Sequence, residues 1–235
     1  LYISLSEVED VNNLIMGTYK DDTLYGTIGN DTIYAKRGND IVHGGEGNDR
    51  IYAGSGDDLI YGEGGNDTLV LNGTGTQLFD GGADNDTIQL DLTNWEGSLD
   101  PDYDQIIEVN LLDGHSGQKG NTSLQDKLIN IENIEFIGIV DTQIIGNSFD
   151  NILIGGSGDD VISSGTGDDS IYGKGGDDTL IMNGSGTQLF DGGQGKDTIQ
   201  LDLSDWTISL NPDYDQIIEV NLIDGISGQK DNTTL

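Results

Sequence analysis

The feature that most constrains the fold of this chain is a nine-residue period of glycine, aspartate and a large aliphatic side chain. The period runs in two blocks, which begin at Gly17 and Gly146, and residues 44–52 (GGEGNDRIY) show it in full. In all ten units the eighth position is aliphatic, and the sixth is aspartate or, once, asparagine. Such regularity favours a stack of repeated structural units over a globule or a free coil.

Each unit divides into six loop residues and three strand residues. Glycine permits the backbone conformations that a tight loop needs, and a trio such as Arg50-Ile51-Tyr52 is β-prone. Side chains alternate along a strand, so an inward eighth residue places the seventh and ninth outside. One inward residue in nine is a thin core. We therefore expect two trios to face each other in an eighteen-residue coil, and stacked coils to bury a continuous aliphatic ladder.

The acidity of the chain, with a formal net charge of −34, argues against nucleic acid and membrane insertion and favours cations as partners. In stacked coils, aspartates eighteen residues apart, such as Asp31 and Asp49, come into line about 4.8 Å apart. Two such carboxylates repel by about 0.8 kcal/mol in water and by more near a protein surface. A divalent cation between them reverses this effect, and carboxylate and carbonyl oxygens suit Ca²⁺. The alternative is that these aspartates only cap turns.

These units resemble the RTX (repeats-in-toxin) calcium-binding nonapeptide, G-G-x-G-x-D-x-U-x, which residues 44–52 match at every fixed position. The resemblance implies an all-β fold, a right-handed parallel β-roll, with several Ca²⁺ ions bound between turns one coil apart. It also implies secretion in an unfolded state and folding on meeting extracellular calcium. The metal ligands that it implies are Asp22, Asp31, Asp40, Asp49, Asp58, Asp67, Asp86, Asn151, Asp160, Asp169, Asp178 and Asp197.

One unit in each block departs from the pattern. In residues 71–79 (LNGTGTQLF) we expect Leu78 to be the inward aliphatic residue and Thr76 to replace the ligand aspartate. One extra residue, Asp80, then follows before the phase resumes, which leaves the pairing of Asp86 open. The same departure recurs 111 residues later in the second block.

The chain also contains a long tandem duplication, because residues 67–124 return as residues 178–235 with most positions identical. Because the chain starts without Met and stops inside a repeated segment, we expect a piece of a larger array. The expected divisions are a lead-in strand at 1–16, a first nonapeptide block at 17–89, a β-rich spacer at 90–145, a second block at 146–200, and a truncated copy of 90–124 at 201–235.

The spacer carries strand patterns at 88–92, 106–112 and 128–136, with a loop expected at Gly114–Gly120. The Ile-Glu-Asn-Ile stretch at 131–134 is similar to the lead-in of many RTX blocks. Trp95 and its duplicate Trp206 are either core plugs or a sugar-stacking surface.

We expect no catalytic site. His43 occupies an outward strand position and His115 is isoleucine in the duplicate, so both are expected at the surface. The chain has no cysteine and no phosphate-binding glycine motif. Paired carboxylates are what calcium columns require and do not indicate glycosidase chemistry. Outward tyrosines such as Tyr34 and Tyr52 are read as a stacked aromatic ladder, with a binding surface as the alternative.

The leading hypothesis is a calcium-binding structural segment of a secreted or cell-surface protein, of the adhesin, surface-layer or matrix-fibre type. Its partners are calcium, neighbouring repeats of the same chain and further copies in a fibre or layer. The alternative is a calcium-dependent secretion and folding module of an exported hydrolase or toxin. Ice binding needs a regular row of Thr and Asn, which the third position of the units does not supply.

Overall fold

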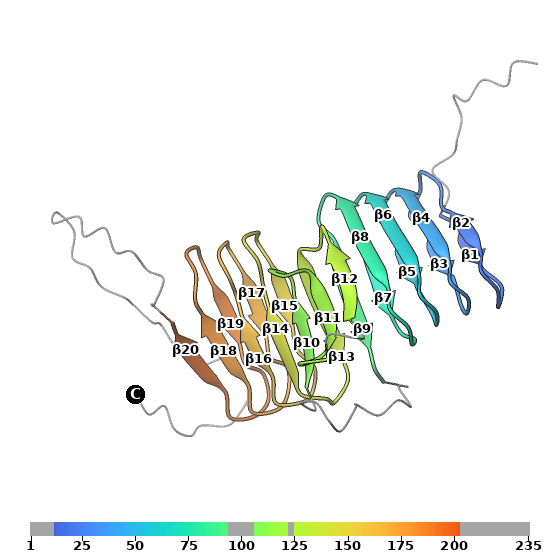
Figure 1. Cartoon of the computed structure of the whole chain (residues 1–235). Coiled ribbons are helices and arrows are strands. Elements are labelled where there is room, and N and C mark those ends of the chain that lie inside the picture. Colours follow the sequence, from blue (N-terminus) through green and yellow to red (C-terminus); the bar gives the residue numbers. More distant parts are fainter. Residues whose placement is uncertain (1–11, 94–105, 122–124, 203–235) are drawn as a thin grey trace, which may run out of the picture.

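The computed structural model describes residues 12–93, 106–121 and 125–202, which form twenty β-strands and no helix (Figure 1). No helix long and apolar enough to cross a membrane occurs in these ranges. The strands stack into a β-solenoid of about nine coils, which confirms the predicted all-β parallel β-roll. Two sheets, of nine and eleven strands, form its opposite walls.

Strands of the nonapeptide blocks alternate between the two walls. The nine-stranded sheet holds β1 (Leu14–Met16), at the end of the lead-in, and then β3 (Thr32–Tyr34), β5 (Arg50–Tyr52), β7 (Thr68–Leu71) and β9 (Thr87–Asp91). The eleven-stranded sheet holds β2 (Thr23–Tyr25), β4 (Ile41–Glu46), β6 (Leu59–Gly64) and β8 (Leu78–Ala83). In the second block, β15 (Ile152–Ile154), β17 (Ser170–Tyr172) and β19 (Leu189–Asp191) continue the first sheet. The second sheet continues through β14 (Thr142–Ile145), at the end of the spacer, and then β16 (Val161–Ser163), β18 (Thr179–Met182) and β20 (Thr198–Leu201).

The register confirms that two nonapeptides make one coil. Ile33 pairs with Ile51 and Ile51 with Leu69, each eighteen residues further along, and all these strand pairs are parallel. Glycines such as Gly45 and Gly47 turn the loops with φ of 108° and 104°, a backbone region that favours glycine.

The core is the predicted ladder of eighth-position side chains. Ile33, Ile51 and Ile60 are fully buried, whereas the seventh and ninth residues of the same trios, such as Arg50 and Tyr52, are only half-buried. Each buried aliphatic side chain contributes about 1.5–3 kcal/mol of transfer free energy. In most regular coils the interior is therefore a single row of large side chains for each sheet, and it widens next to the spacer, where Leu90 and Phe136 are also buried.

The prediction for residues 71–79 is wrong in its alignment. Leu78 pairs with the outward Leu59, and Phe79 pairs with the core residue Ile60, nineteen residues earlier. The extra residue therefore comes before the loop, where Leu71 lengthens β7 and pairs with Leu90 in β9. Phe79 is fully buried and replaces the aliphatic side chain in the core.

The spacer continues the solenoid through β10 (Ile107–Asn110), β11 (His115–Gln118), β12 (Gln125–Ile129) and β13 (Asn133–Ile137). β13 alone lies between β9 and β15, but three strands lie between β8 and β14 in the order β12-β11-β10. β11 runs antiparallel to both of its neighbours. At about 4.8 Å per strand, the eleven-stranded wall is longer by about 10 Å. In Figure 1 the strands after the spacer lie displaced from the line of the first block.

The prediction of a loop at Gly114–Gly120 is wrong, because β11 occupies most of it. Antiparallel pairing to β10 and β12 satisfies its backbone on both sides. Ser116 is fully buried there, and its hydroxyl donates a hydrogen bond to Asp126. A polar stretch without alternation gave no strand signal in the sequence.

The duplicated segments lie on opposite walls. Thr87–Asp91 form β9 of the nine-stranded sheet, whereas their duplicates in β20, Thr198–Leu201, belong to the eleven-stranded sheet. The long period therefore exchanges the two walls of the solenoid. Trp95, Trp206, residues 1–11 of the lead-in and nearly all of the copy at 201–235 lie outside the described residues, and the expected domain divisions stay predictions.

Candidate metal-binding loops

The sixth residues of the units stack into two columns, one in the loops that lead into each sheet. The column before the nine-stranded sheet, here the nine-strand column, contains Asp31, Asp49, Asp67, Asp86, Asn151 and Asp169. The column before the eleven-stranded sheet, here the eleven-strand column, contains Asp22, Asp40, Asp58, Asp160, Asp178 and Asp197.

In every column member except Asp22 and Asn151, one carboxylate oxygen accepts a backbone N–H of the preceding coil. Oδ1 of Asp49 accepts the backbone N–H of Asp31 at 2.7 Å, and Oδ1 of Asp67 accepts that of Asp49 at 2.8 Å. The register between neighbouring coils is thus fixed by side-chain hydrogen bonds in the loops as well as by the backbone hydrogen bonds of the strands. This bond also fixes the direction of the second oxygen, Oδ2.

The second oxygen is buried and free in most of the column. It has no hydrogen-bond partner among the described residues in Asp40, Asp49, Asp58, Asp67, Asp86, Asp169 and Asp178. A buried anionic oxygen without a partner costs free energy, so native proteins pair such groups with a donor or a metal ion. These seven oxygens therefore fit a bound cation.

Main-chain carbonyl oxygens face the same positions. A Cβ atom added to Gly44 would lie 2.6 Å from both Asp49 Oδ2 and the carbonyl oxygen of Gly62, one coil further on. The two oxygens therefore face one space beside a glycine. No three His, Cys, Asp or Glu side chains converge to hold a metal in the described ranges, so a cation here depends on backbone carbonyls. Such a set of hard oxygen ligands suits Ca²⁺.

Burial raises the pKa of these carboxyl groups. It raises the pKa of Asp49, Asp58, Asp86 and Asp178 to about 6 and that of Asp67 to about 7, and neighbouring carboxylates of the column add to the effect. At neutral pH and without a cation, the columns therefore carry carboxylates whose ionised form is disfavoured.

Three aspartates of the predicted set are satisfied by the protein. Oδ2 of Asp22 accepts the N–H and hydroxyl of Thr18, which lowers the pKa of Asp22, and Oδ2 of Asp31 accepts the same groups of Thr27. The sequence signal is threonine in place of the second glycine. Oδ2 of Asp160 accepts the N–H of Gly156.

Two further members of the set differ from the rest. The side-chain amide of Asn151 donates to the Glu132 carbonyl at 2.6 Å and to Asn147 Oδ1 at 3.0 Å. Asp197 is exposed, although its Oδ1 accepts the N–H of Asp178 at 3.1 Å.

Glutamine takes the sixth position in the departing units. The corrected alignment places Gln77 and Gln188 in the columns. The amide of Gln77 donates to the Gly56 carbonyl, and that of Gln188 to the Gly167 carbonyl, both at 2.7 Å. The two copies thus supply an N–H donor, instead of a carboxylate, at equivalent coils on opposite walls.

A second ladder, at the fifth position, was missed by the sequence analysis. Asn30 Oδ1 accepts the N–H of Asn48 at 2.8 Å, and Asn48 Oδ1 accepts that of Asn66 at 2.9 Å. These bonds connect each coil to the following one, whereas the sixth-position bonds connect it to the preceding one. The signal is the Asn or Asp that recurs at the fifth position.

The outward aromatic residues form stacked ladders, as one of the two sequence hypotheses predicted. Tyr34 and Tyr52 stack with ring centroids 4.3 Å apart, and His43 stacks between Tyr25 and Tyr61 at 5.0 and 5.2 Å. His115 lies 2.8 Å from Glu108 on the neighbouring strand. Both histidines therefore make structural contacts on the sheet faces.

Stacked parallel coils, glycine loops and columns of buried carboxylates define a calcium-binding β-solenoid repeat. The family model of the RTX calcium-binding nonapeptide repeat matches residues 9–42, 37–69 and 145–180. The chain therefore contains RTX calcium-binding repeats within 9–69 and 145–180, as the resemblance implied. No curated protein matches the chain.

Proposed function

We propose that this chain is a structural segment of a secreted or cell-surface protein that folds and stiffens when it binds extracellular Ca²⁺. The observation that carries the proposal is the set of seven buried carboxylate oxygens without a partner, distributed along both columns of the solenoid. Extracellular calcium-binding modules bind in the range of about 10⁻⁴ to 10⁻³ M, which suits a switch between the cell interior and the outside.

Without metal, the chain has little to hold it together. Its formal net charge is −34, and most regular half-coils place only one large apolar side chain in the core. A ligand that binds only the folded state adds its binding free energy to folding. Calcium bound along both columns therefore converts a repelling stack into a stiff rod.

We propose a physical role, without catalysis, for this segment. The long duplication repeats a stretch of the solenoid's own sequence, which extends a rod and does not build one unique site. An adhesin, a surface-layer protein or a matrix fibre uses such an extension directly, and the two regular walls permit side-by-side association of copies.

The test is far-UV circular dichroism during a calcium titration of the metal-stripped chain, with magnesium as the control. A cooperative transition to β-structure with calcium, but not with magnesium at the same concentration, supports the proposal. A chain that is already fully β-structured without metal would show that the columns do not drive folding.

A further inference from the structure

The loop between β12 and β13 breaks the repeat pattern but continues a column. Only three residues, Asn130, Ile131 and Glu132, replace the six loop residues of a regular unit. Ile129 pairs with Asp80, which brings Asn130 level with Gly81. Ile134 pairs with Ile88, which brings Glu132 level with Asp86 in the nine-strand column.

Glu132 acts as the next member of this column. Its Oε2 accepts the backbone N–H of Asp86 at 2.8 Å, just as Asp86 Oδ1 accepts the N–H of Asp67 at 2.8 Å. Glutamate has one more methylene group than aspartate, which lets a shorter loop reach the same donor. The carboxylate series of the first block thus extends by one residue into the spacer.

The space beside Asp86 has the features of a regular site. Asp86 is fully buried, and its Oδ2 has no partner among the described residues. A Cβ atom added to Gly81 would lie less than 3.0 Å from both Asp86 Oδ2 and the Asn130 carbonyl. At the regular coil before it, a Cβ atom on Gly62 would meet Asp67 Oδ2 and the Gly81 carbonyl in the same way.

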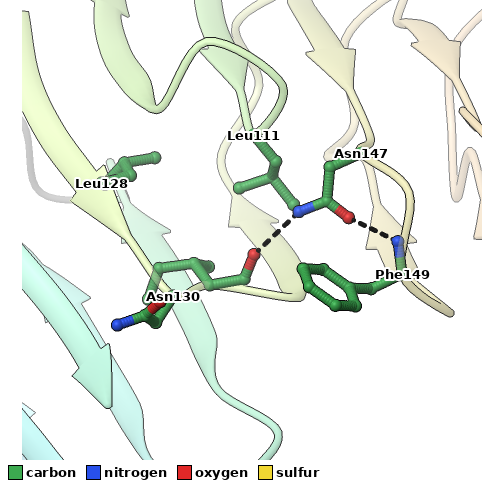
Figure 2. A pocket seen from close by; sticks show the side chains of 6 residues that line it. Leu111, Leu128, Asn130, Asn147 and Phe149 are labelled. Carbon is green, nitrogen blue, oxygen red and sulfur yellow. Dashed lines mark hydrogen bonds between the residues drawn. The ribbon is translucent and has the colours of Figure 1, made fainter.

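Asn130, which lines a pocket together with Leu111 and Phe149 (Figure 2), is held in the conformation that presents this carbonyl. Its φ of 50° lies in the left-handed region, which asparagine tolerates better than most residues. Its side-chain amide donates to Asp80 Oδ1 at 2.8 Å. The spacer therefore places a main-chain oxygen where a regular unit places that of its first glycine.

We propose that Asp86, Glu132 and the Asn130 carbonyl form a calcium site that fastens the spacer to the first block. The proposal rests on the calcium binding proposed above and adds ligands from outside the nonapeptide repeats. The site is the last one in the first block's part of the nine-strand column. In the next column member, Asn151, the side-chain amide fills the corresponding position and donates to the Glu132 carbonyl and to Asn147 Oδ1.

The opposite wall joins the spacer without metal. Asp126 continues the eleven-strand column, and its Oδ1 accepts the N–H of Gln77 at 2.9 Å. Its Oδ2 accepts the Ser116 hydroxyl at 2.9 Å, so neither oxygen is left open. The junction between the first block and the spacer therefore binds one calcium ion, on the side of the nine-stranded sheet only.

Native mass spectrometry of the whole chain in calcium counts the bound ions and tests this site. Asp86→Asn is expected to bind one ion fewer than the unaltered chain. Glu132→Gln is expected to lose the same ion at calcium concentrations that keep the other sites filled. The matched control is Glu135→Gln, because Glu135 lies three residues after Glu132, within β13, and accepts a hydrogen bond from Gln89 on the sheet face. Unchanged counts in both Asp86→Asn and Glu132→Gln overturn the site.

If Asp86→Asn does not fold, the unaltered chain crystallised with Tb³⁺ provides the test. An anomalous peak between Asp86 and Asn130 supports the site, and peaks in the regular loops without one there overturn it. Absence of bound calcium and of every such peak would instead overturn the proposed function. The two failures are thus distinguishable.

Discussion

The backbone N–H of Asp49 donates to Oδ1 of Asp67, 2.8 Å away and one coil further on, and Asp67 Oδ2 remains buried without a partner. The Asp67 carboxylate thus stabilises the stack of coils through Oδ1, whereas its buried, unpartnered Oδ2 destabilises the stack.

Asp67→Asn is expected to stabilise the metal-free chain and to weaken its response to calcium. The change keeps the acceptor for the Asp49 N–H but removes an unpartnered buried charge, a group that costs about 1–3 kcal/mol or more. Circular dichroism without metal and during a calcium titration checks both directions. Asp57→Asn is the control, because Asp57 is exposed and already accepts the N–H of Thr76. Equal behaviour of the two variants would contradict a metal role for Asp67.

Acidification is expected to stabilise the metal-free fold. Burial raises the pKa of Asp49 and Asp58 to about 6 and that of Asp67 to about 7, from the ordinary aspartate value of 3.8. A group with a raised folded pKa favours folding below its unfolded pKa, and this contribution is lost as the pH rises through the folded pKa. The β-content of the metal-stripped chain should therefore rise as the pH falls from about 8 towards 5.

The calcium-loaded chain should respond to pH in the opposite direction. Protons compete with the cation for the same oxygens, so the calcium concentration at half-folding should increase as the pH falls over this range.

A metal-free chain that loses β-structure on acidification would show that the columns are not the groups that titrate.

Gln77→Asp is expected to make folding more dependent on calcium. The substitution removes the amide that donates to the Gly56 carbonyl and adds a carboxylate to the eleven-strand column. The metal-free chain should lose stability, and at saturation one additional ion should bind, as counted by native mass spectrometry. The neighbouring Thr76→Asp, at an exposed fifth position, is the control and should bind no additional ion in the loop.

Ile60→Ala is expected to destabilise the calcium-loaded roll by about 2–5 kcal/mol, because it leaves a cavity in a one-residue-thick core. Leu59→Ala, at the outward neighbour that is 38% exposed, should change stability by about 0.5 kcal/mol or less. Urea unfolding in saturating calcium measures both variants. Similar losses for the two would show that the calcium columns, and not the aliphatic ladder, set the stability of the coil.

The nine-residue period correctly predicted the features that repeat from one coil to the next. It placed Ile51 inside, Tyr52 outside and Asp49 level with Asp67, because parallel stacking at one register leaves these positions no alternative. It failed where the loop length changes. Phe79, not Leu78, enters the core because an extra residue is absorbed in β7, a choice that pattern alone cannot make.

The spacer was less predictable because its contacts are irregular. β11 depends on antiparallel pairing and on the hydrogen bond between Ser116 and Asp126. No local sequence pattern predicts either of these contacts. Glu132 was read only as part of a lead-in, since its place in the column depends on a loop shortened to three residues. The fifth-position ladder, by contrast, was visible in the sequence and was overlooked.

The exchange of walls between the duplicates bears on the shape of longer arrays. A spacer that adds two strands to one wall tilts the axis away from that wall. Because β9 and its duplicate β20 lie on opposite walls, the next copy of the same sequence meets the solenoid from the other side. In an array of such copies, successive tilts are opposed and cancel in pairs. An array in which every spacer had the form of this one would zigzag about a straight line, and two copies, not one, would make its translational repeat.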